Sequence, residues 1–392
     1  MTQSDSGHFF TRHGDSAEDD LLDSPGRLEA ADTGGLLRAA ATAGAQVRST
    51  AAAAAEAGLS RLAGQRPRAL VFLTRPGAAL TAAPLLVTLL GASCPVPVVT
   101  TPAVPMWVGA LDIVLADTTD PGDRELAEGL DRAVRRGAQV VLTAPAEGPV
   151  AAAIAGRAVL VVPRLEVPPG LTLPRALSAG LLLLDALDLL ATNAEVLAGE
   201  LDREAERDHI AHELLVNPAK SLALRLSART PLLWGIDPVA TAVARHGAWA
   251  LAAHAGVVAH AAGFSEAAAL PVLRQEATRA GGAADVFSDP FADPLEDSPP
   301  RAGVPALRPV LLGVLGDPHS EPERAAAGNA LPSADVVTVD EELMVRQGEP
   351  GAAACAAAVL ALRFDFAALY LGLSRGVLGG PGWVGSAGPA IS

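Results

Sequence analysis

The chain has 392 residues, of which 50% are hydrophobic and only 3% aromatic, and its formal net charge is −15. This length favours two domains or one large domain, and the apolar content excludes a disordered protein. The acidic balance argues against a nucleic-acid partner, because nucleic acid attracts basic surfaces.

The sequence lacks the patterns of a secreted or membrane protein. Residues 1–20 are polar and acidic, unlike a signal peptide, and we expect them to form a flexible tail. The leucine-rich run 181–190 is too short and too charged to span a bilayer. Cys94 and Cys355 lie in apolar surroundings, as is typical of buried thiols in a reducing compartment. We therefore expect a cytoplasmic protein with no membrane partner.

The first half of the chain alternates helices with short apolar strands. Strands are predicted at 67–73, 96–99, 111–117, 139–143 and 158–162, the second of them at a sheet edge because of Pro97. Helices are predicted at 36–63, 80–90 and 124–136, and a long helix from Leu173 to about residue 205. Strands that alternate with helices through short turns indicate an α/β fold, a parallel sheet with helices on both faces.

The second half opens at Asn217-Pro218-Ala219-Lys220 and repeats the alternation. Asn217 is a favourable N-cap and Pro218 suits a first helical turn. Strands are predicted at 231–235, 247–252, 308–315 and 335–339, and a helix at 353–374. The acidic, proline-rich segment 285–300 is predicted to be a surface loop, and residues 377–392 a flexible tail.

Two places in the first half have side chains suited to chemistry. The turn 118–123 follows the third strand, where ligands of parallel sheets bind, and its hydroxyls and helix-start amides suit a phosphate. The alternative is that Thr119 or Asp120 only caps the next helix. Arg175 could pair with a phosphate or a developing oxyanion, or be a solvated residue of a helix start.

The histidines and glycines of the chain suggest neither a metal nor a nucleotide site. His246, His254 and His260 are close in sequence, but no cysteine or glutamate completes a metal set at the right spacing. No P-loop and no Gly-x-Gly-x-x-Gly pattern is present. We expect no cofactor and no metal.

The order of these motifs resembles the bifunctional phosphoglucose/phosphomannose isomerases, which consist of two sugar-isomerase (SIS) domains. The resemblance spans about residues 21–376. It is carried by the segments Leu21–Pro25, Arg135–Val141, Pro174–Ala176, Asn217–Lys220 and Asp365–Leu373. It implies two SIS domains, at 21–205 and 206–376, each a doubly wound, flavodoxin-like parallel sheet.

The resemblance also implies roles for individual residues. The phosphate loop of the family corresponds here to the turn that contains Thr118, Thr119, Gly122 and Asp123, and the family's catalytic arginine to Arg175. The positions of the family's base, histidine and C-terminal lysine are substituted, with Ala253 in place of the glutamate base. The nearest substitutes are His254, His260 and Glu266.

The function implied is therefore binding of a phosphorylated hexose by a homodimeric SIS protein whose aldose–ketose isomerase activity is weak or lost. Loss of a general base commonly costs orders of magnitude in rate. Two alternatives stay open. One is an active phosphohexose isomerase whose base has moved to His254, His260 or Glu266, and the other is a non-enzymatic regulator or scaffold of sugar-nucleotide metabolism.

Overall fold

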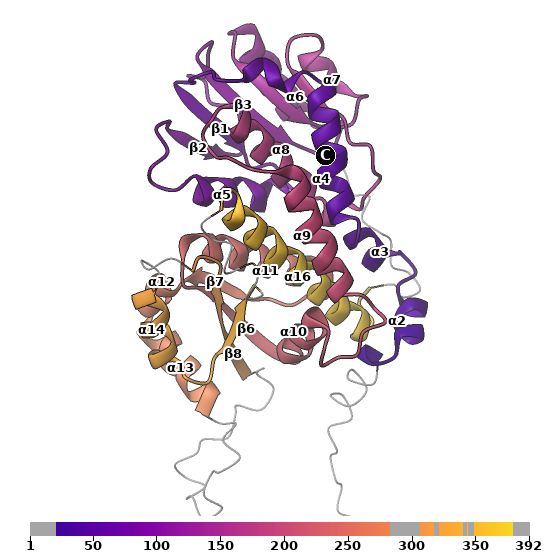
Figure 1. Cartoon of the computed structure of the whole chain (residues 1–392), viewed down its shortest axis with the longest axis vertical. Helices are drawn as coiled ribbons and strands as arrows, with labels where there is room; N and C mark the ends of the chain where they lie inside the picture. The colour runs from indigo at the N-terminus through magenta and orange to yellow at the C-terminus, as the bar shows by residue number, and fades with distance from the viewer. Residues whose placement is uncertain (1–20, 283–305, 317–320, 340–342, 344–348, 379–392) are drawn as a thin grey trace, which may run out of the picture.

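The computed structural model describes residues 21–282, 306–316, 321–339, 343 and 349–378. The expected tails at 1–20 and 379–392 and the expected loop at 285–300 lie outside the described residues. Figure 1 shows two sheets, one above the other, with helices between and outside them.

The first sheet is parallel throughout and has the strand order β2-β1-β3-β4-β5. Its strands are β1 (Ala69–Leu73), β2 (Val98–Thr101), β3 (Asp112–Asp117), β4 (Gln139–Thr143) and β5 (Val159–Val161). Leu70 pairs with Ile113, so the central strands are in register over their apolar runs. Successive side chains point to opposite faces, which is why both faces of this sheet need a helical cover.

The second sheet is also parallel, with the order β7-β6-β8-β9. Its strands are β6 (Arg229–Gly235), β7 (His260–Gly263), β8 (Ala306–Gly313) and β9 (Asp335–Thr338). In both sheets the chain starts at a central strand, moves to one neighbour and then crosses to the other side. The predicted α/β class with two doubly wound parallel sheets is confirmed.

The helices form three layers around the two sheets. α6 (Arg124–Arg135) and α7 (Pro149–Ile154) cover the outer face of the first sheet, and α12 (Phe264–Ala268), α13 (Pro271–Gly282) and α14 (Glu321–Ala330) that of the second. One continuous core lies between the sheets. Its helices are α2 (Pro25–Ala31), α3 (Leu36–Ala40), α4 (Ala43–Glu56), α5 (Ala79–Leu90), α8 (Leu173–Ala186), α9 (Ala194–Arg207), α10 (Pro218–Leu226), α11 (Pro238–Ala255) and α16 (Ala352–Ser374).

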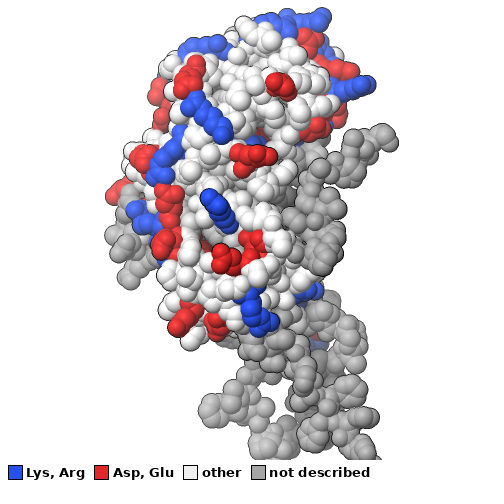
Figure 2. All heavy atoms as spheres, turned by 90° about the vertical axis from the view of Figure 1, so that its right-hand side faces the viewer, with Lys and Arg blue, Asp and Glu red and all other residues white. Residues whose placement is uncertain are grey.

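Polar contacts accompany the apolar core where the two halves meet. His246 of α11 is buried and its ring nitrogens contact Thr81 Oγ1 of α5 at 3.2 Å and Asp365 Oδ1 of α16 at 2.9 Å. At the surface, acidic and basic side chains alternate over the face that α4 and α9 present (Figure 2). Arg48 of α4 pairs there with Glu195 and Asp202 of α9. No single sign of charge dominates this face.

α16 is the central helix of the shared core. It is long and apolar enough to cross a membrane, but 94% of its most apolar window is buried inside the protein. A helix that is hydrophobic on all sides is either a membrane span or a helix buried in a protein core. The burial of α16 inside the protein accounts for its apolar composition.

Three predicted boundaries or elements are wrong. The expected strand at 247–252 lies inside α11, and the real strand β7 follows that helix. The long helix predicted from Leu173 to about 205 is two helices, α8 and α9, because Asp188 adopts a left-handed backbone conformation (φ 56°) and Asn193 caps a new start. The helix expected at 36–63 is divided into α3, α4 and a 3-10 turn at Leu59–Leu62.

The helix start predicted at Asn217 is confirmed. The Asn217 side chain accepts a hydrogen bond from the backbone N–H of Lys220 (2.8 Å). Lys220, the only lysine of the sequence, is fully buried and donates from Nζ to the carbonyl oxygens of Ile210 (2.8 Å) and His212 (2.7 Å). Its ammonium also lies 5.6 Å from the centre of the Tyr370 ring of α16. The motif therefore ties the start of α10 to the preceding loop and to the central helix.

Candidate functional site

Arg175 lies at the carboxyl edge of the first sheet, where parallel sheets bind their ligands. It stands in the first turn of α8, which Pro174 helps to start. Its guanidinium donates to Asp117, the last residue of β3, from Nε at 3.2 Å and from Nη2 at 3.3 Å. Both side chains are buried. Burial raises the pKa of the Asp117 carboxyl, and the charge of Arg175 opposes that rise.

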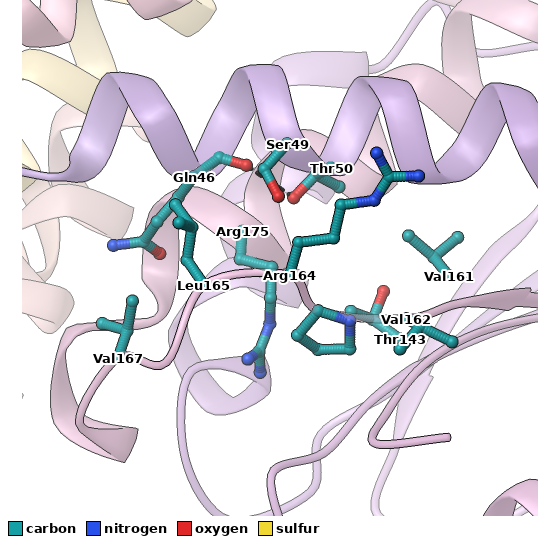
Figure 3. A pocket seen from close by; sticks show the side chains of 11 residues that line it. Gln46, Ser49, Thr50, Thr143, Val161, Val162, Arg164, Leu165, Val167 and Arg175 are labelled. Atoms are coloured by element: carbon teal, nitrogen blue, oxygen red, sulfur yellow. Dashed lines mark hydrogen bonds between the residues drawn. The ribbon is translucent and has the colours of Figure 1, made fainter.

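Polar side chains from three other parts of the chain surround Arg175. Figure 3 shows Gln46, Ser49 and Thr50 on one helix, α4, with the guanidinium of Arg175 pointing away from it. Thr143 closes the end of β4, and Arg164 comes from the segment after β5. The cavity between them measures about 10 Å³, the space of about one water molecule.

Two buried atoms at this cavity lack a hydrogen-bond partner among the described residues, Gln46 Oε1 and Thr143 Oγ1. Gln46 and Thr143 are 3% and 0% exposed. Buried polar atoms of native proteins are nearly always paired, so such atoms mark a place where a ligand or water belongs. The charged residues of the described lining are two arginines, Arg164 and Arg175, and their carboxylate partners, Glu56 and Asp117, lie outside that lining. The cavity is therefore suited to an anionic, hydroxyl-rich ligand.

The turn predicted to bind phosphate lies nearby, but several of its amides and side chains already form hydrogen bonds or ion pairs. The backbone N–H of Asp120 donates to Thr118 Oγ1 (3.0 Å), and that of Gly122 to Asp120 Oδ1 (2.8 Å). Asp123 caps α6 through the N–H of Leu126 (3.0 Å) and pairs with Arg75 at 2.6 Å. Thr119 is half-buried. A phosphate at this turn would have to compete with the carboxylates of Asp120 and Asp123 for the same amides.

The other three predicted catalytic residues lie in separate places. His254 is near the end of α11, where its ring contacts Gly170 and lies edge-on to Trp249, and burial lowers its pKa. His260 opens β7 at the edge opposite the ligand-binding edge, and accepts from Trp234 Nε1 at 3.2 Å. Glu266 lies in α12, just after β7, and its Oε2 is 3.6 Å from Arg245 Nη2. The described contacts do not join these three residues to one another or to Arg175.

Sequence reasoning missed the residues that surround Arg175. Gln46, Ser49 and Thr50 are three and four positions apart, so they lie on one side of a helix. A polar stripe in an otherwise alanine-rich helix was the available signal. Thr143 was also available, as the last residue of a correctly predicted strand.

The fold is similar to those of several solved structures. The chain aligns with a hypothetical protein from Thermus thermophilus (TM-score 0.58, 12% identity, 92% of this chain and 90% of that chain). It also aligns with the C-terminal domain of glucosamine-fructose-6-phosphate aminotransferase from Francisella tularensis (TM-score 0.53, 11% identity, 95% and 98%). A third is tagatose-6-phosphate ketose/aldose isomerase from Escherichia coli (TM-score 0.52, 9% identity, 88% and 91%).

These similarities concern the fold. No family model matches the sequence, and no curated protein matches it. The shared architecture covers nearly the whole chain and nearly the whole of each solved structure, and it is the fold of a pair of SIS domains.

Proposed function

We propose that the protein binds a phosphorylated sugar beside Arg175, and that its aldose–ketose isomerase activity is weak or lost. The observation that carries the proposal is the cavity at the carboxyl edge of the first sheet. Two arginines, three hydroxyls and one amide line it, and two buried polar atoms there have no partner among the described residues. Arginines match phosphate oxygens in charge and geometry, and hydroxyls and amides match those of a sugar.

The size of the cavity implies that binding moves part of the wall. A space of about 10 Å³ is far too small for a hexose phosphate. Pro163, Arg164, Leu165 and Val167 form one wall, and α4 forms another. Arg164 is held by Glu56 of α4 in a pair whose side chains are 43% and 70% exposed. Exposed pairs contribute little to stability, so exchanging Glu56 for a phosphate would cost little.

The reason to expect weak or lost isomerisation is the placement of the bases. Proton transfer between two carbons of a sugar needs a base within hydrogen-bond reach of the substrate. His254, His260 and Glu266 do not share a site with Arg175. One observation favours the alternative of an active isomerase: Asp117 combines a carboxylate of raised pKa with an adjacent cation. In that case Asp117, rather than the histidines, would be the base.

Several features that the sequence led us to expect remain predictions. They are the glucose or mannose configuration of the sugar, the phosphate contacts of Thr118, Thr119, Gly122 and Asp123, the domain limits 21–205 and 206–376, the homodimer and the cytoplasmic location.

The proposal predicts that ligand binding depends strongly on Arg164 and on the phosphate group of the sugar. Fructose 6-phosphate or mannose 6-phosphate should raise the melting temperature in a saturable way, because a ligand that binds only the native state stabilises it. Fructose and mannose should not. Arg164→Ala should raise the dissociation constant at least about tenfold, since a charge-assisted contact contributes roughly 1.5–3 kcal/mol.

Arg157→Ala is the matched control, because Arg157 has a similar exposed fraction (42%) and contacts Asp131 on the outer surface. Equal affinity in the Arg164 and Arg157 variants, or no shift with any sugar phosphate, would contradict the proposal. A coupled isomerase assay completes the test. Turnover that disappears in Asp117→Asn would establish the alternative.

A further inference from the structure

A second hollow lies at the carboxyl edge of the second sheet. It measures about 270 Å³, and six of its polar lining residues are Thr88, Thr241, Arg245, Ser265, Glu266 and Glu323. They come from α5, α11, α12 and α14, so both halves of the chain contribute. Ligand sites of proteins commonly lie at the ends of parallel strands and between domains.

The place where this edge would hold an anion is already filled by Asp237, which also lines the hollow. Asp237 is 3% exposed and caps α11, with Oδ1 accepting from the N–H of Ala240 at 2.7 Å. Its Oδ2 accepts from the N–H groups of Val314 (2.8 Å) and Leu315 (3.0 Å), which follow β8. A helix start together with loop amides is the usual phosphate cradle of such sheets. Here a side-chain carboxylate occupies it.

The charge of the remaining lining also disfavours a phosphate. Among the described lining residues, Asp237, Glu266 and Glu323 are carboxylates and Arg245 is the only cation. Arg245 Nη2 lies 3.6 Å from Glu266 Oε2 in an exposed pair, so carboxylates still outnumber cations in the described lining. A partly enclosed acidic hollow repels anions and raises the local concentration of cations.

The hydroxyls of the lining can receive hydrogen bonds from a polyol. Thr88 donates its own proton to the carbonyl of Leu85 (2.9 Å), and Thr241 to that of Asp237 (2.9 Å). A hydroxyl that donates to the backbone retains its lone pairs for another donor. Sugar hydroxyls are such donors.

We propose that this hollow is a second ligand site, which binds an unphosphorylated amino sugar. The ammonium group faces the carboxylates of Glu266 and Glu323, and the sugar hydroxyls contact Thr88, Thr241 and Ser265. The site differs from the cavity beside Arg175 in sheet, charge and ligand. It needs none of the residues of that cavity, so it does not depend on the proposed function.

Calorimetric titration of the full chain with glucosamine tests this inference. The titration is run near pH 6, where an amine of this type is protonated. We expect saturable binding of glucosamine and an affinity for glucose at least about tenfold lower, because glucose lacks the charge that the carboxylates attract. Glucose 6-phosphate should not compete for this site. Glu266→Gln and Glu323→Gln should each weaken glucosamine binding about fivefold or more, because each removes one attracting charge.

Glu321→Gln is the matched control, since Glu321 belongs to the same helix as Glu323 but does not line the hollow. Three results would overturn the inference: no saturation at millimolar glucosamine, equal affinity for glucose, or equal losses in the Glu321 and Glu323 variants. Arg164→Ala should leave glucosamine binding unchanged, which separates this site from the one beside Arg175.

Discussion

Lys220→Met is expected to lower the free energy of unfolding by roughly 3 kcal/mol, because it removes two hydrogen bonds from a charged donor in the protein interior. Methionine has a similar length and fills the same volume. It leaves the carbonyl oxygens of Ile210 and His212 without the donor that now holds them at 2.8 and 2.7 Å. Burial lowers the pKa of the Lys220 ammonium, so part of the cost of burying a charge is recovered in the variant. The unpaired carbonyls outweigh that gain.

Urea denaturation measures the loss, and Arg225→Met is the control. Arg225 belongs to the same helix, is 43% exposed and should change stability by no more than about 0.5 kcal/mol. Because Lys220 is the only lysine, an amine-reactive reagent followed by mass spectrometry reports the opening of this region in the unmodified sequence. Rapid labelling of Lys220 under native conditions, or equal stability of the two variants, would refute the role assigned to it.

Capping residues explain which parts of the fold were predictable from the sequence. Asn217 and Pro218 located the start of α10, and the cap forms as expected. The same type of signal flanks the segment 247–252, because Asp237 and Pro238 start α11 and Gly256 ends it. The short apolar run inside that helix resembles a strand, since periodicity alone does not separate a buried strand from a buried helix. In this segment and at Asn193, the capping residues predict the helix boundaries better than the apolar periodicity does.

The candidate site was less predictable than the fold, because its residues meet only in three dimensions. The turn after β3 was identified from the expected parallel sheet, and Arg175 from its place after Pro174 and from the resemblance to the isomerase family. Gln46, Ser49 and Thr50 precede the first strand, and their sequence shows only a polar stripe on a helix. Whether such a stripe faces solvent or the edge of a sheet depends on how the helix packs. Here the helix packs against a distant part of the chain, because Gln46 Nε2 donates to the carbonyl oxygen of Leu171 (3.1 Å).

The second large effect is expected at Glu204, in the buried contact between α9 and α16. Glu204 is 0% exposed and accepts from Arg363 Nε at 2.5 Å and from Arg207 Nη1 at 3.1 Å. Glu204→Gln retains the shape of the side chain but removes the negative charge that the buried Arg363 contacts through Nε. Removing one partner of a buried ion pair costs about 3–5 kcal/mol, since the remaining charge stays in a medium of low polarity. Glu206→Gln on the same helix, where the side chain is 78% exposed, should cost no more than about 0.5 kcal/mol.

The neighbouring Asp208 makes the stability lost in Glu204→Gln depend on pH. Burial and, next, the charge of Glu204 raise the pKa of Asp208 well above its usual value. Between the ordinary pKa near 3.8 and the raised one, the folded protein holds a proton that the unfolded chain has released. Stability due to Asp208 is therefore present at low pH and falls as pH rises through this window. In Glu204→Gln the pKa of Asp208 rises less, so this fall is smaller and the deficit of the variant narrows toward neutral pH. Denaturation curves of both proteins across this range measure the difference, and a deficit that widens with pH would contradict the coupling of the two carboxyl groups.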